Sequence, residues 1–330
     1  MMRTMFIFSD GEFKRKDNTV MFDMGDRKQY LPIHEVDEML IFGEVSLNKR
    51  FLELCSQNEI ILHFFNFHGY YTGSFYPREH LNSGYVLLKQ AEHYLVPEKR
   101  MILAKGFVSG AVKNIRQVLK YYDNRGKNLR GTLEEIESLA LHVKDVNSID
   151  GLMAIEGNIR ECYYKAFDEI LQNEDFVFDV RTKRPPKNYL NTLISFGNSI
   201  LYTIILSEIY KTHLDPRIGY LHATNFRRFS LNLDVAEIFK PIMVDRVIFT
   251  VVNEHMVTKD DFGKEGNGVF LKESGRKAFI GELMRKLETT ISHRDVGRPV
   301  SYRRLIRLEL YKLEKHIMGE KQYTPFVASW

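Results

Sequence analysis

The chain has 330 residues, of which 44% are hydrophobic and 12% aromatic, so global disorder is excluded and one large or two ordinary domains are expected. Its two cysteines, Cys55 and Cys162, exclude a disulfide framework and favour a reducing, cytoplasmic environment. The net charge is +4, but residues 1–80 hold 9 Lys and Arg against 12 Asp and Glu, and the remainder holds 38 against 31. An anionic partner is therefore expected to meet the second part of the chain.

Residues 4–76 have the pattern of a small β-rich domain. Short aromatic or branched runs alternate with turn signals such as SDG, KDN and MGD, which is typical of strands in a small sandwich or rolled sheet. One helix is predicted in SLNKRFLELCSQ, with Ser46 as its N-cap. The scattered histidines of this region indicate no site, so we expect it to serve in dimerisation or docking.

From Ser83 onward the apolar spacing becomes helical, and Pro97 separates a first helix from a second. Further helices are predicted at about 132–143, 149–172, 188–212, 232–254, 274–290 and 299–318. The glycines of Gly263–Gly268 are interpreted as a loop. The sequence thus predicts an α+β protein, with a small β-rich N-terminal domain at residues 1–82 and a larger all-helical domain at residues 83–330.

The most apolar helical stretch, Thr192–Leu206, is shorter than the ~20 residues that span a bilayer, and small polar residues interrupt it. The N-terminal apolar run is too short for a signal peptide. These features predict a soluble cytoplasmic protein with no membrane contact.

The stretch Pro216–Pro241 concentrates candidate metal ligands. His222 lies in a predicted loop, and Asp234 and Glu237 are three residues apart on a predicted helix, so they share one face. Carboxylates with one imidazole and open positions suit a divalent metal that serves phosphate chemistry, with the imidazole favouring manganese. The alternative is a solvated helix face beside a structural histidine.

A third carboxylate, Glu156, stands at the edge of the apolar stripe of its predicted helix. Gly157 beside it leaves room for a ligand or another backbone. The residues alone favour a different reading, in which Glu156 is a surface side chain paired with Arg160 one turn later.

Three groups of basic residues are candidates for DNA backbone contacts, from their charge and position and not from any motif. The first lies in the proline-containing segment 181–187, the second follows His222, and the third shares a face of the last helix. Their members are Arg181, Lys183 and Arg184, then Arg227 and Arg228, then Arg303 and Arg307. Charge runs of this kind are also typical of a solvated surface.

Four stretches in order resemble the CRISPR-associated spacer-acquisition integrase family, Cas1. The first, LMAIEGNIRECYY, is similar to the family's helix with its first metal-binding glutamate, and PKNYLNTLISFGNSILY is similar to its buried Asn-x-Leu-x-Ser-Phe-Gly helix. Asp215–Pro241 resembles the family's loop and helix with the remaining ligands, and YTPFVASW resembles its C-terminus. The branch it resembles most accompanies type I-B systems.

The resemblance implies an all-helical catalytic domain, a homodimer, and a heterocomplex with the small companion protein Cas2. It implies that Glu156, His222 and Glu237 bind Mg²⁺ or Mn²⁺ and that Asp234 supports them. The last ligand is often Asp in relatives, so Glu237 is longer by one methylene group. The implied reaction joins the 3′-hydroxyl of a spacer precursor, a double-stranded DNA, to a phosphodiester of the CRISPR repeat, and water in its place gives endonuclease activity.

Two other functions stay open at this stage. One is a stand-alone metal-dependent DNA nuclease of repair or mobile-element transposition that uses the same site. The other is a structural nucleic-acid-binding protein whose acidic residues are only surface groups.

Overall fold

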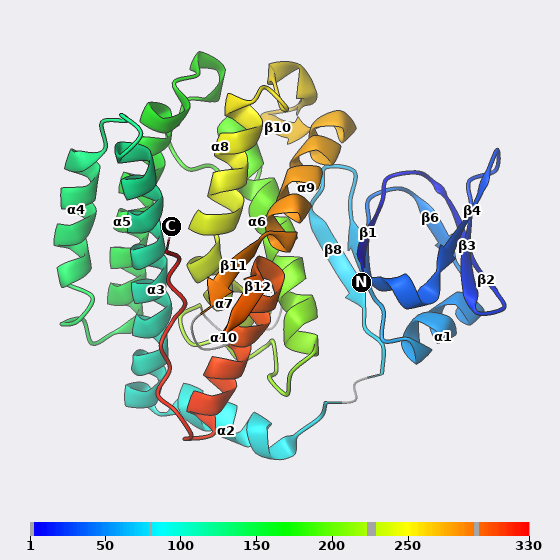
Figure 1. Ribbon diagram of the computed structural model, residues 1–330, viewed down its shortest axis with the longest axis horizontal. Coiled ribbons are helices and arrows are strands. Elements are labelled where there is room, and N and C mark those ends of the chain that lie inside the picture. Colours follow the sequence, from blue (N-terminus) through cyan, green and yellow to red (C-terminus); the bar gives the residue numbers. More distant parts are fainter. Residues whose placement is uncertain (1–2, 79–80, 223–228, 294–296, 330) are drawn as a thin grey trace. The chain divides into compact units, whose positions relative to one another are not determined.

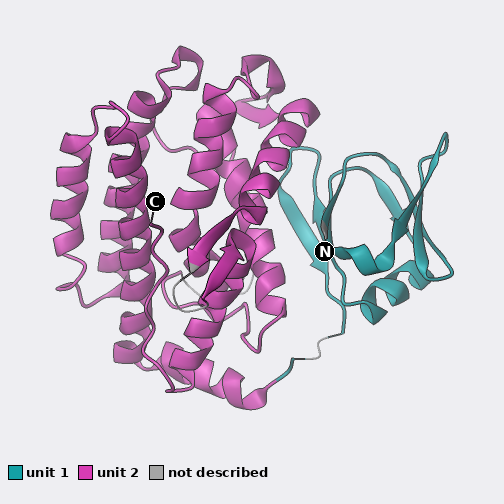
Figure 2. Cartoon of the chain, in the orientation of Figure 1, with its two compact units in different colours: residues 1–82 teal, residues 83–330 magenta. Residues whose placement is uncertain are grey.

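The computed structural model describes residues 3–78, 81–222, 229–293 and 297–329. The chain forms two compact units, Met1–Asn82 and Ser83–Trp330 (Figure 2). Each unit is described by itself.

The first unit contains two four-stranded sheets. One has the order β1-β5-β7-β8, in which β7 and β8 are antiparallel and the other pairs are parallel. The second has the order β4-β3-β2-β6, in which β2 and β6 are parallel. The strands are β1 Arg3–Ile7, β2 Gly11–Lys16, β3 Thr19–Asp23, β4 Lys28–Pro32, β5 Val36–Ile41, β6 Val45–Leu47, β7 Ile61–Phe65 and β8 Tyr71–Phe75.

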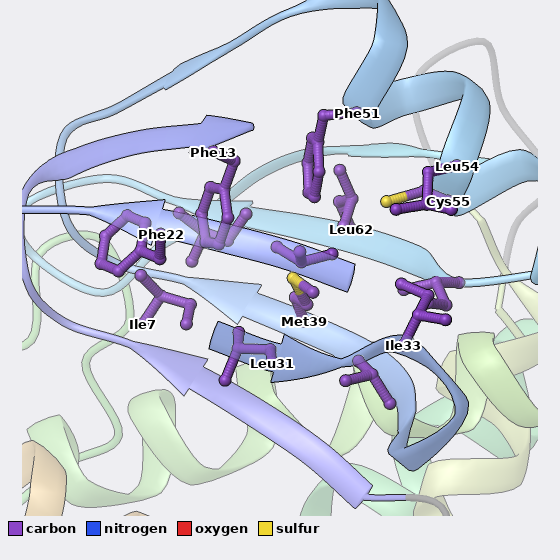
Figure 3. Packing of buried hydrophobic residues seen from close by; sticks show 14 residues of the cluster. Ile7, Phe13, Phe22, Leu31, Ile33, Met39, Phe51, Leu54, Cys55 and Leu62 are labelled. Carbon is purple, nitrogen blue, oxygen red and sulfur yellow. The ribbon is translucent and has the colours of Figure 1, made fainter. Parts of the chain in front are cut away.

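The core of this unit is apolar and aromatic (Figure 3). Phe13 stacks on Phe22 and on Phe51, with ring centroids 4.4 Å and 4.9 Å away. Phe51 comes from α1, Lys49–Gln57, whose N-cap is Asn48. The predicted cap at Ser46 was wrong, because Ser46 pairs with Glu12 in the short strand β6, which the sequence analysis did not predict.

Ten-residue and longer helices dominate the second unit, and Figure 1 shows α3, α4 and α5 as packed neighbours. The predicted break at Pro97 is confirmed, because Pro97 is the first residue of α3. The long helices are α2 Gly84–Leu95, α3 Pro97–Asp123, α4 Arg130–Leu141, α5 Ile149–Leu171, α6 Tyr189–Tyr210, α9 Glu273–Glu288 and α10 Tyr302–Ile317.

The prediction of one helix over 232–254 needs a correction. The segment consists of α7 Leu231–Phe239, a π-helical stretch Pro241–Asp245, and α8 Arg246–Asn253. Pro241 does not interrupt the helical conformation, because it lies at the first position of the π-helical stretch. The backbone N–H of Asp245 donates to the carbonyl of Lys240 at 3.0 Å, five residues back, which is the π-type bond.

The second unit is not all-helical, so the predicted fold class was wrong in this respect. It holds two antiparallel hairpins, β9 Phe262–Glu265 with β10 Gly268–Leu271, and β11 Thr290–His293 with β12 Arg298–Ser301. The segment interpreted as a loop, Gly263–Gly268, lies inside the first hairpin, whose turn is Gly266–Asn267, with Gly266 at a φ of +54°. A Gly-Asn pair between strand-like residues is a hairpin signal that was available in the sequence.

The predicted helix at 188–212 is observed as α6, Tyr189–Tyr210, which extends beyond the apolar stretch Thr192–Leu206 at both ends. Its 22 residues, with a mean hydropathy of 1.3 in the most apolar window, would reach across a bilayer by length and composition. Within the described residues it is the one helix of that kind, and 83% of this window is buried inside the protein. Burial of this extent is typical of a core helix.

Candidate active site

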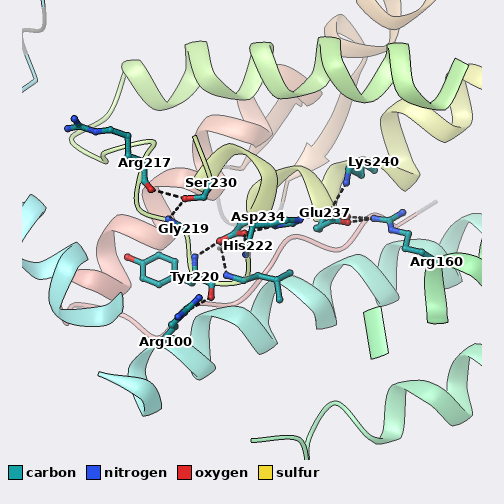
Figure 4. A network of polar contacts seen from close by, with 11 residues as sticks. Arg100, Arg160, Arg217, Gly219, Tyr220, His222, Ser230, Asp234, Glu237 and Lys240 are labelled. Atoms are coloured by element: carbon teal, nitrogen blue, oxygen red, sulfur yellow. Dashed lines mark hydrogen bonds and ion pairs between the residues drawn. The ribbon is translucent and has the colours of Figure 1, made fainter. Parts of the chain in front are cut away.

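The carboxylate of Asp234 organises the loop that precedes α7. It accepts three backbone N–H groups, from Tyr220 at 2.5 Å, Leu221 at 3.0 Å and His222 at 2.9 Å. Asp234 is completely buried. The solvated helix face considered from the sequence is therefore wrong for this residue, which is an internal anchor for the loop (Figure 4).

Two further contacts fix the same loop. The hydroxyl of Ser230 accepts the N–H of Gly219 at 2.9 Å and donates to the carbonyl of Arg217 at 2.7 Å. A Cβ atom at Gly219 would lie 2.9 Å from Asp234 Oδ2, so the approach of loop and helix requires glycine. The buried Gln90 of α2 donates to the carbonyl oxygens of Asp215 and Ile218. Gln90 was not predicted as a residue of the site.

His222 is oriented by Asp234 and directed toward Glu237. Its Nδ1 lies 2.8 Å from Asp234 Oδ1, and its Nε2 lies 3.8 Å from Glu237 Oε1. Burial lowers the pKa of His222, but the carboxylate of Asp234 outweighs it, so the pKa is raised overall. A carboxylate on Nδ1 leaves Nε2 as the outward nitrogen, which is the arrangement of many metal-bound histidines.

Glu237 is held between two cations. Its Oε1 accepts a hydrogen bond from Lys240 Nζ at 2.5 Å, and its Oε2 accepts one from Arg160 Nη2 at 2.6 Å (Figure 4). Burial raises the pKa of Glu237, but Lys240 and Arg160 outweigh burial and hold the pKa well below its usual value. Glu237 is 3% exposed, so it is not a surface group. The two cations favour the ionised form of its carboxylate inside the protein.

Arg160 joins α5 to α7. Its Nε donates to Glu156 Oε1 at 3.1 Å, and its Nη2 also donates to the carbonyl of Glu237 at 3.2 Å. The pairing of Glu156 with Arg160 that the residues alone favoured is confirmed, but its placement on the surface is wrong, because Arg160 is 7% exposed and bridges two helices. Burial and the charge of Glu237 raise the pKa of Glu156. A Cβ atom at Gly157 would meet no atom within 4 Å, so the surface beside Glu156 is open.

Asp245, at the end of the π-helical stretch, was not predicted as a site residue. It is completely buried, and its Oδ2 lies 3.9 Å from Arg160 Nη1. Burial raises the pKa of Asp245 to about 7, against the opposing effects of Arg160 and Lys240. Three carboxylates thus surround the guanidinium of Arg160.

The donor set fits a divalent cation, although its members are not drawn together around one point. Among the residues that the structure describes, no three or more His, Cys, Asp or Glu side chains have the geometry of a metal cluster. Glu156 and Glu237 nevertheless lie close enough for the charge of one to raise the pKa of the other. A divalent cation bound by these two carboxylates and the imidazole would relieve that repulsion. Arg160 and Lys240 hold the oxygens that the cation would take.

The predicted basic segment is anchored rather than loose. Arg181 donates to Asn191 Oδ1 at 2.9 Å and to Ser195 Oγ at 3.0 Å, which ties it to the start of α6. The carbonyl of Pro186 accepts the N–H of Val269 in β10 at 2.9 Å. Arg181 therefore acts as a structural clamp, and the hairpin missed by sequence analysis braces the segment.

Lys183 and Arg184 are exposed on this segment. Although the residue as a whole is exposed, partial desolvation of its ammonium group and the cations Arg181 and Lys240 lower the pKa of Lys183, while Glu156 and Glu237 act in the opposite direction. The ammonium group of Lys183 therefore lies within electrostatic range of the candidate site.

The arginines of the last helix have a carboxylate partner of their own. Arg307 Nε donates to Glu208 Oε2 at 2.6 Å, and Arg303 Nη1 lies 3.6 Å from Glu208 Oε1. Glu208 is a completely buried residue of α6. These contacts give Arg303 and Arg307 a structural role. Arg227 and Arg228 lie outside the described residues.

Comparison with known proteins identifies a family. The model of the family described as "CRISPR associated protein Cas1" matches residues 5–285. A protein named "CRISPR-associated endonuclease Cas1 2" from Thermodesulfovibrio yellowstonii is 59% identical over 330 residues, which is all of both chains. The solved structure of TM1797, a Cas1 protein from Thermotoga maritima, is 46% identical with a TM-score of 0.89, and the match covers 98% of this chain and all of that one.

Two less similar structures share the fold. A casposase bound to an integration product has a TM-score of 0.89 at 19% identity, and the match covers 99% of this chain and 93% of that one. A chain of a Cas6-RT-Cas1–Cas2 complex has a TM-score of 0.86 at 18% identity and covers all of this chain and 36% of that one.

Proposed function

The chain belongs to the Cas1 family of CRISPR-associated proteins, and we propose that it is the integrase and endonuclease that inserts new spacers into CRISPR arrays. The name of the relative from Thermodesulfovibrio yellowstonii, an endonuclease, supports the nuclease activity. The observation that carries the proposal is that Arg160 joins Glu156 to the buried Glu237, while the imidazole of His222, oriented by Asp234, lies 3.8 Å from the same Glu237 carboxylate.

The metal dependence is part of this proposal. Glu156, His222 and Glu237 would hold Mg²⁺ or Mn²⁺, with Asp234 supporting His222. When bound, such an ion supplies Lewis-acid stabilisation of the charge that develops on the transferred phosphoryl group. Asp234 keeps the Nδ1 proton on His222, so that Nε2 faces the site as an acceptor.

The basic residues would orient the DNA. Lys183 stands exposed beside the site and offers an ammonium group to a phosphate oxygen. The anchored backbone of segment 181–187 keeps that group in place without the entropy cost of ordering a free loop. The 3′-hydroxyl of a spacer precursor is then the nucleophile for integration, and water is the nucleophile for endonuclease activity.

We further propose the partners and setting that the family membership suggests. They are double-stranded DNA, a second copy of this chain and Cas2, with the first unit serving in dimerisation or docking. The Cas1–Cas2 complex among the structural matches supports the Cas2 assignment. We also propose that the protein belongs to the type I-B branch. We propose the prokaryotic cytoplasm as its location, because relatives such as those from Thermodesulfovibrio yellowstonii and Thermotoga maritima are prokaryotic proteins.

A strand-transfer assay tests the function. Labelled duplex DNA with free 3′-hydroxyl ends is mixed with a plasmid that carries a CRISPR repeat, with Mn²⁺ or with a chelator. His222→Ala and Glu156→Gln are expected to reduce joining about 100-fold or more. Glu161→Gln is the matched control, because Glu161 is an exposed residue of the same helix, paired with Lys165. Undiminished joining by a folded Glu156→Gln protein contradicts the proposed ligand set.

The same assay separates the alternative enzyme. The fold shared with a casposase favours keeping a stand-alone nuclease or transposition enzyme as a second candidate. Such an enzyme would cut or join DNA with no preference for the repeat boundary and without Cas2. Joining at the repeat boundary that Cas2 stimulates supports spacer integration instead.

A further inference from the structure

The guanidinium of Arg160 uses its two edges differently. The Nε and Nη2 edge is saturated by Glu156 and Glu237, which are the proposed metal ligands. Nη1 belongs to the other edge of the planar fork and faces Asp245 Oδ2 at 3.9 Å, which is beyond hydrogen-bond distance. Arg160 therefore stands between the ligand carboxylates and a third carboxylate.

The carboxylate of Asp245 has oxygen atoms that could still accept hydrogen bonds. Both oxygens of Asp245 and the Nη1 of Arg160 are buried and make no hydrogen bond of regular geometry; the Tyr163 hydroxyl, also without such a bond, lies near enough to lower the pKa of Asp245. Buried polar groups are nearly always satisfied, and unsatisfied ones mark a strained or functional position. Asp245 is completely buried, so bulk solvent does not reach these atoms.

The π-helical stretch explains why Asp245 faces Arg160. Eight residues of regular α-helix would turn Asp245 about 80° away from Glu237. A π-turn contains one extra residue, so Glu237 and Asp245 are placed as if they were seven residues apart in an α-helix. Their directions around the helix axis then differ by only about 20°. The Asp245 N–H to Lys240 carbonyl bond shows that this turn is formed. The helix irregularity thus places both carboxylates on the face that meets α5.

We propose that Asp245 is a positioning residue that receives the guanidinium of Arg160 when a divalent cation takes the oxygens of Glu156 and Glu237. The inference rests on the proposed metal dependence. The cation and Arg160 compete for the same carboxylates, and a buried guanidinium without an anion is strongly unfavourable. The oxygens of Asp245 lie next to Nη1 of Arg160. They provide a carboxylate that Arg160 can bind when it releases Glu156 and Glu237, so that the guanidinium stays paired inside the protein.

Mn²⁺ affinity of the full-length protein, measured by titration calorimetry without DNA, tests the proposal. Asp245→Asn keeps the shape of the side chain and removes its charge, and we expect the Mn²⁺ dissociation constant to rise about tenfold or more. The melting temperature without metal should stay the same or rise, because the substitution removes a buried charge that lacks hydrogen bonds. A purely structural role would lower that melting temperature and leave the Mn²⁺ affinity unchanged, which overturns the proposal.

Measuring the effect of Asp245→Asn in an Arg160→Lys protein distinguishes two roles of Asp245, positioning of the Arg160 guanidinium and simple attraction of the cation by charge. Arg160→Lys keeps the positive charge but cannot contact Glu237 and Asp245 with two separate edges. Asp245→Asn should therefore change the dissociation constant less than about twofold in the Arg160→Lys protein. An equal tenfold loss in both backgrounds means that Asp245 acts by charge alone and overturns the proposal. The melting temperature of each variant is recorded first to establish folding.

Two controls complete the design. Glu309→Gln removes another buried carboxylate, which binds the Tyr323 hydroxyl at 2.6 Å, and should lower the melting temperature without changing Mn²⁺ affinity. The wild-type protein identifies which inference fails. If it binds no Mn²⁺, the proposed metal dependence is wrong. If it binds Mn²⁺ and Asp245→Asn binds equally well, only the role of Asp245 is wrong.

Discussion

The Nδ1 of His222 lies 2.8 Å from Oδ1 of Asp234, and the same carboxylate accepts the backbone N–H groups of residues 220–222. One buried side chain therefore fixes both the path of the loop and the tautomer of the imidazole. The loop cannot shift without losing charge-assisted hydrogen bonds.

Replacing this carboxylate should destabilise the protein. In Asp234→Asn one oxygen becomes an NH₂ group that faces N–H donors, so at least one buried donor loses its acceptor. We expect a loss of about 2–3 kcal/mol in the free energy of unfolding, measured with urea. Asp215→Asn is the matched control, because its carboxylate binds only the neighbouring Arg217, and it should cost less than about 1 kcal/mol. Equal losses in both variants contradict the anchoring role of Asp234.

The two glycines near the site should respond to alanine in opposite directions. At Gly219 a Cβ atom would lie 2.8 Å from the carbonyl carbon of Ser230, so Gly219→Ala should cost about 1–3 kcal/mol of stability. At Gly157, in the middle of α5, nothing lies within 4 Å. Gly157→Ala should stabilise the protein by about 0.5–1 kcal/mol, because alanine favours helix. Urea unfolding of both variants measures the contrast, and a stable Gly219→Ala protein would falsify the close approach of loop and helix.

The basic residues should separate into structural and DNA-contacting groups. Lys183→Ala removes an exposed ammonium group, so stability should change by less than about 0.5 kcal/mol, while DNA binding weakens and its salt dependence decreases by about one unit. Arg307→Ala leaves the buried Glu208 without its hydrogen-bonded cation and should cost about 3 kcal/mol or more. Fluorescence anisotropy at several salt concentrations, beside urea unfolding, distinguishes the two. An unaffected salt dependence in Lys183→Ala argues against phosphate contact.

Acid should weaken the packing of α10 through His316. Its Nδ1 accepts the N–H of Tyr323 at 3.1 Å, which requires an unprotonated nitrogen. Burial and the neighbouring His93 lower the pKa of His316 below 6.5 in the folded protein, so the unfolded chain binds the proton more readily. The contribution to stability is therefore complete above pH 6.5 and is lost as the pH falls below that value. Urea unfolding between pH 7.5 and 5 measures it, and His316→Gln should lose less stability over this range than the wild-type protein.

The sequence alone determined most of the elements, because their signals are local. The helix start at Pro97, the turn signals between the first strands and the apolar stripe of Ile306, Leu310 and Leu313 each depend on neighbours a few residues away. The family resemblance, carried by four motifs in order, was likewise present in the letters and is confirmed by the comparisons.

Only the tertiary structure decided what the charged residues do. Arg160 reads as a surface partner of Glu156 because the sequence shows the neighbour four residues away and hides Glu237, 77 residues away. Glu208 and Arg307 are 99 residues apart, so the structural role of that arginine is equally invisible. Charge in a sequence gives only the possibility of a contact. Burial and the partner's position fix the energy of that contact, and both arise from long-range packing.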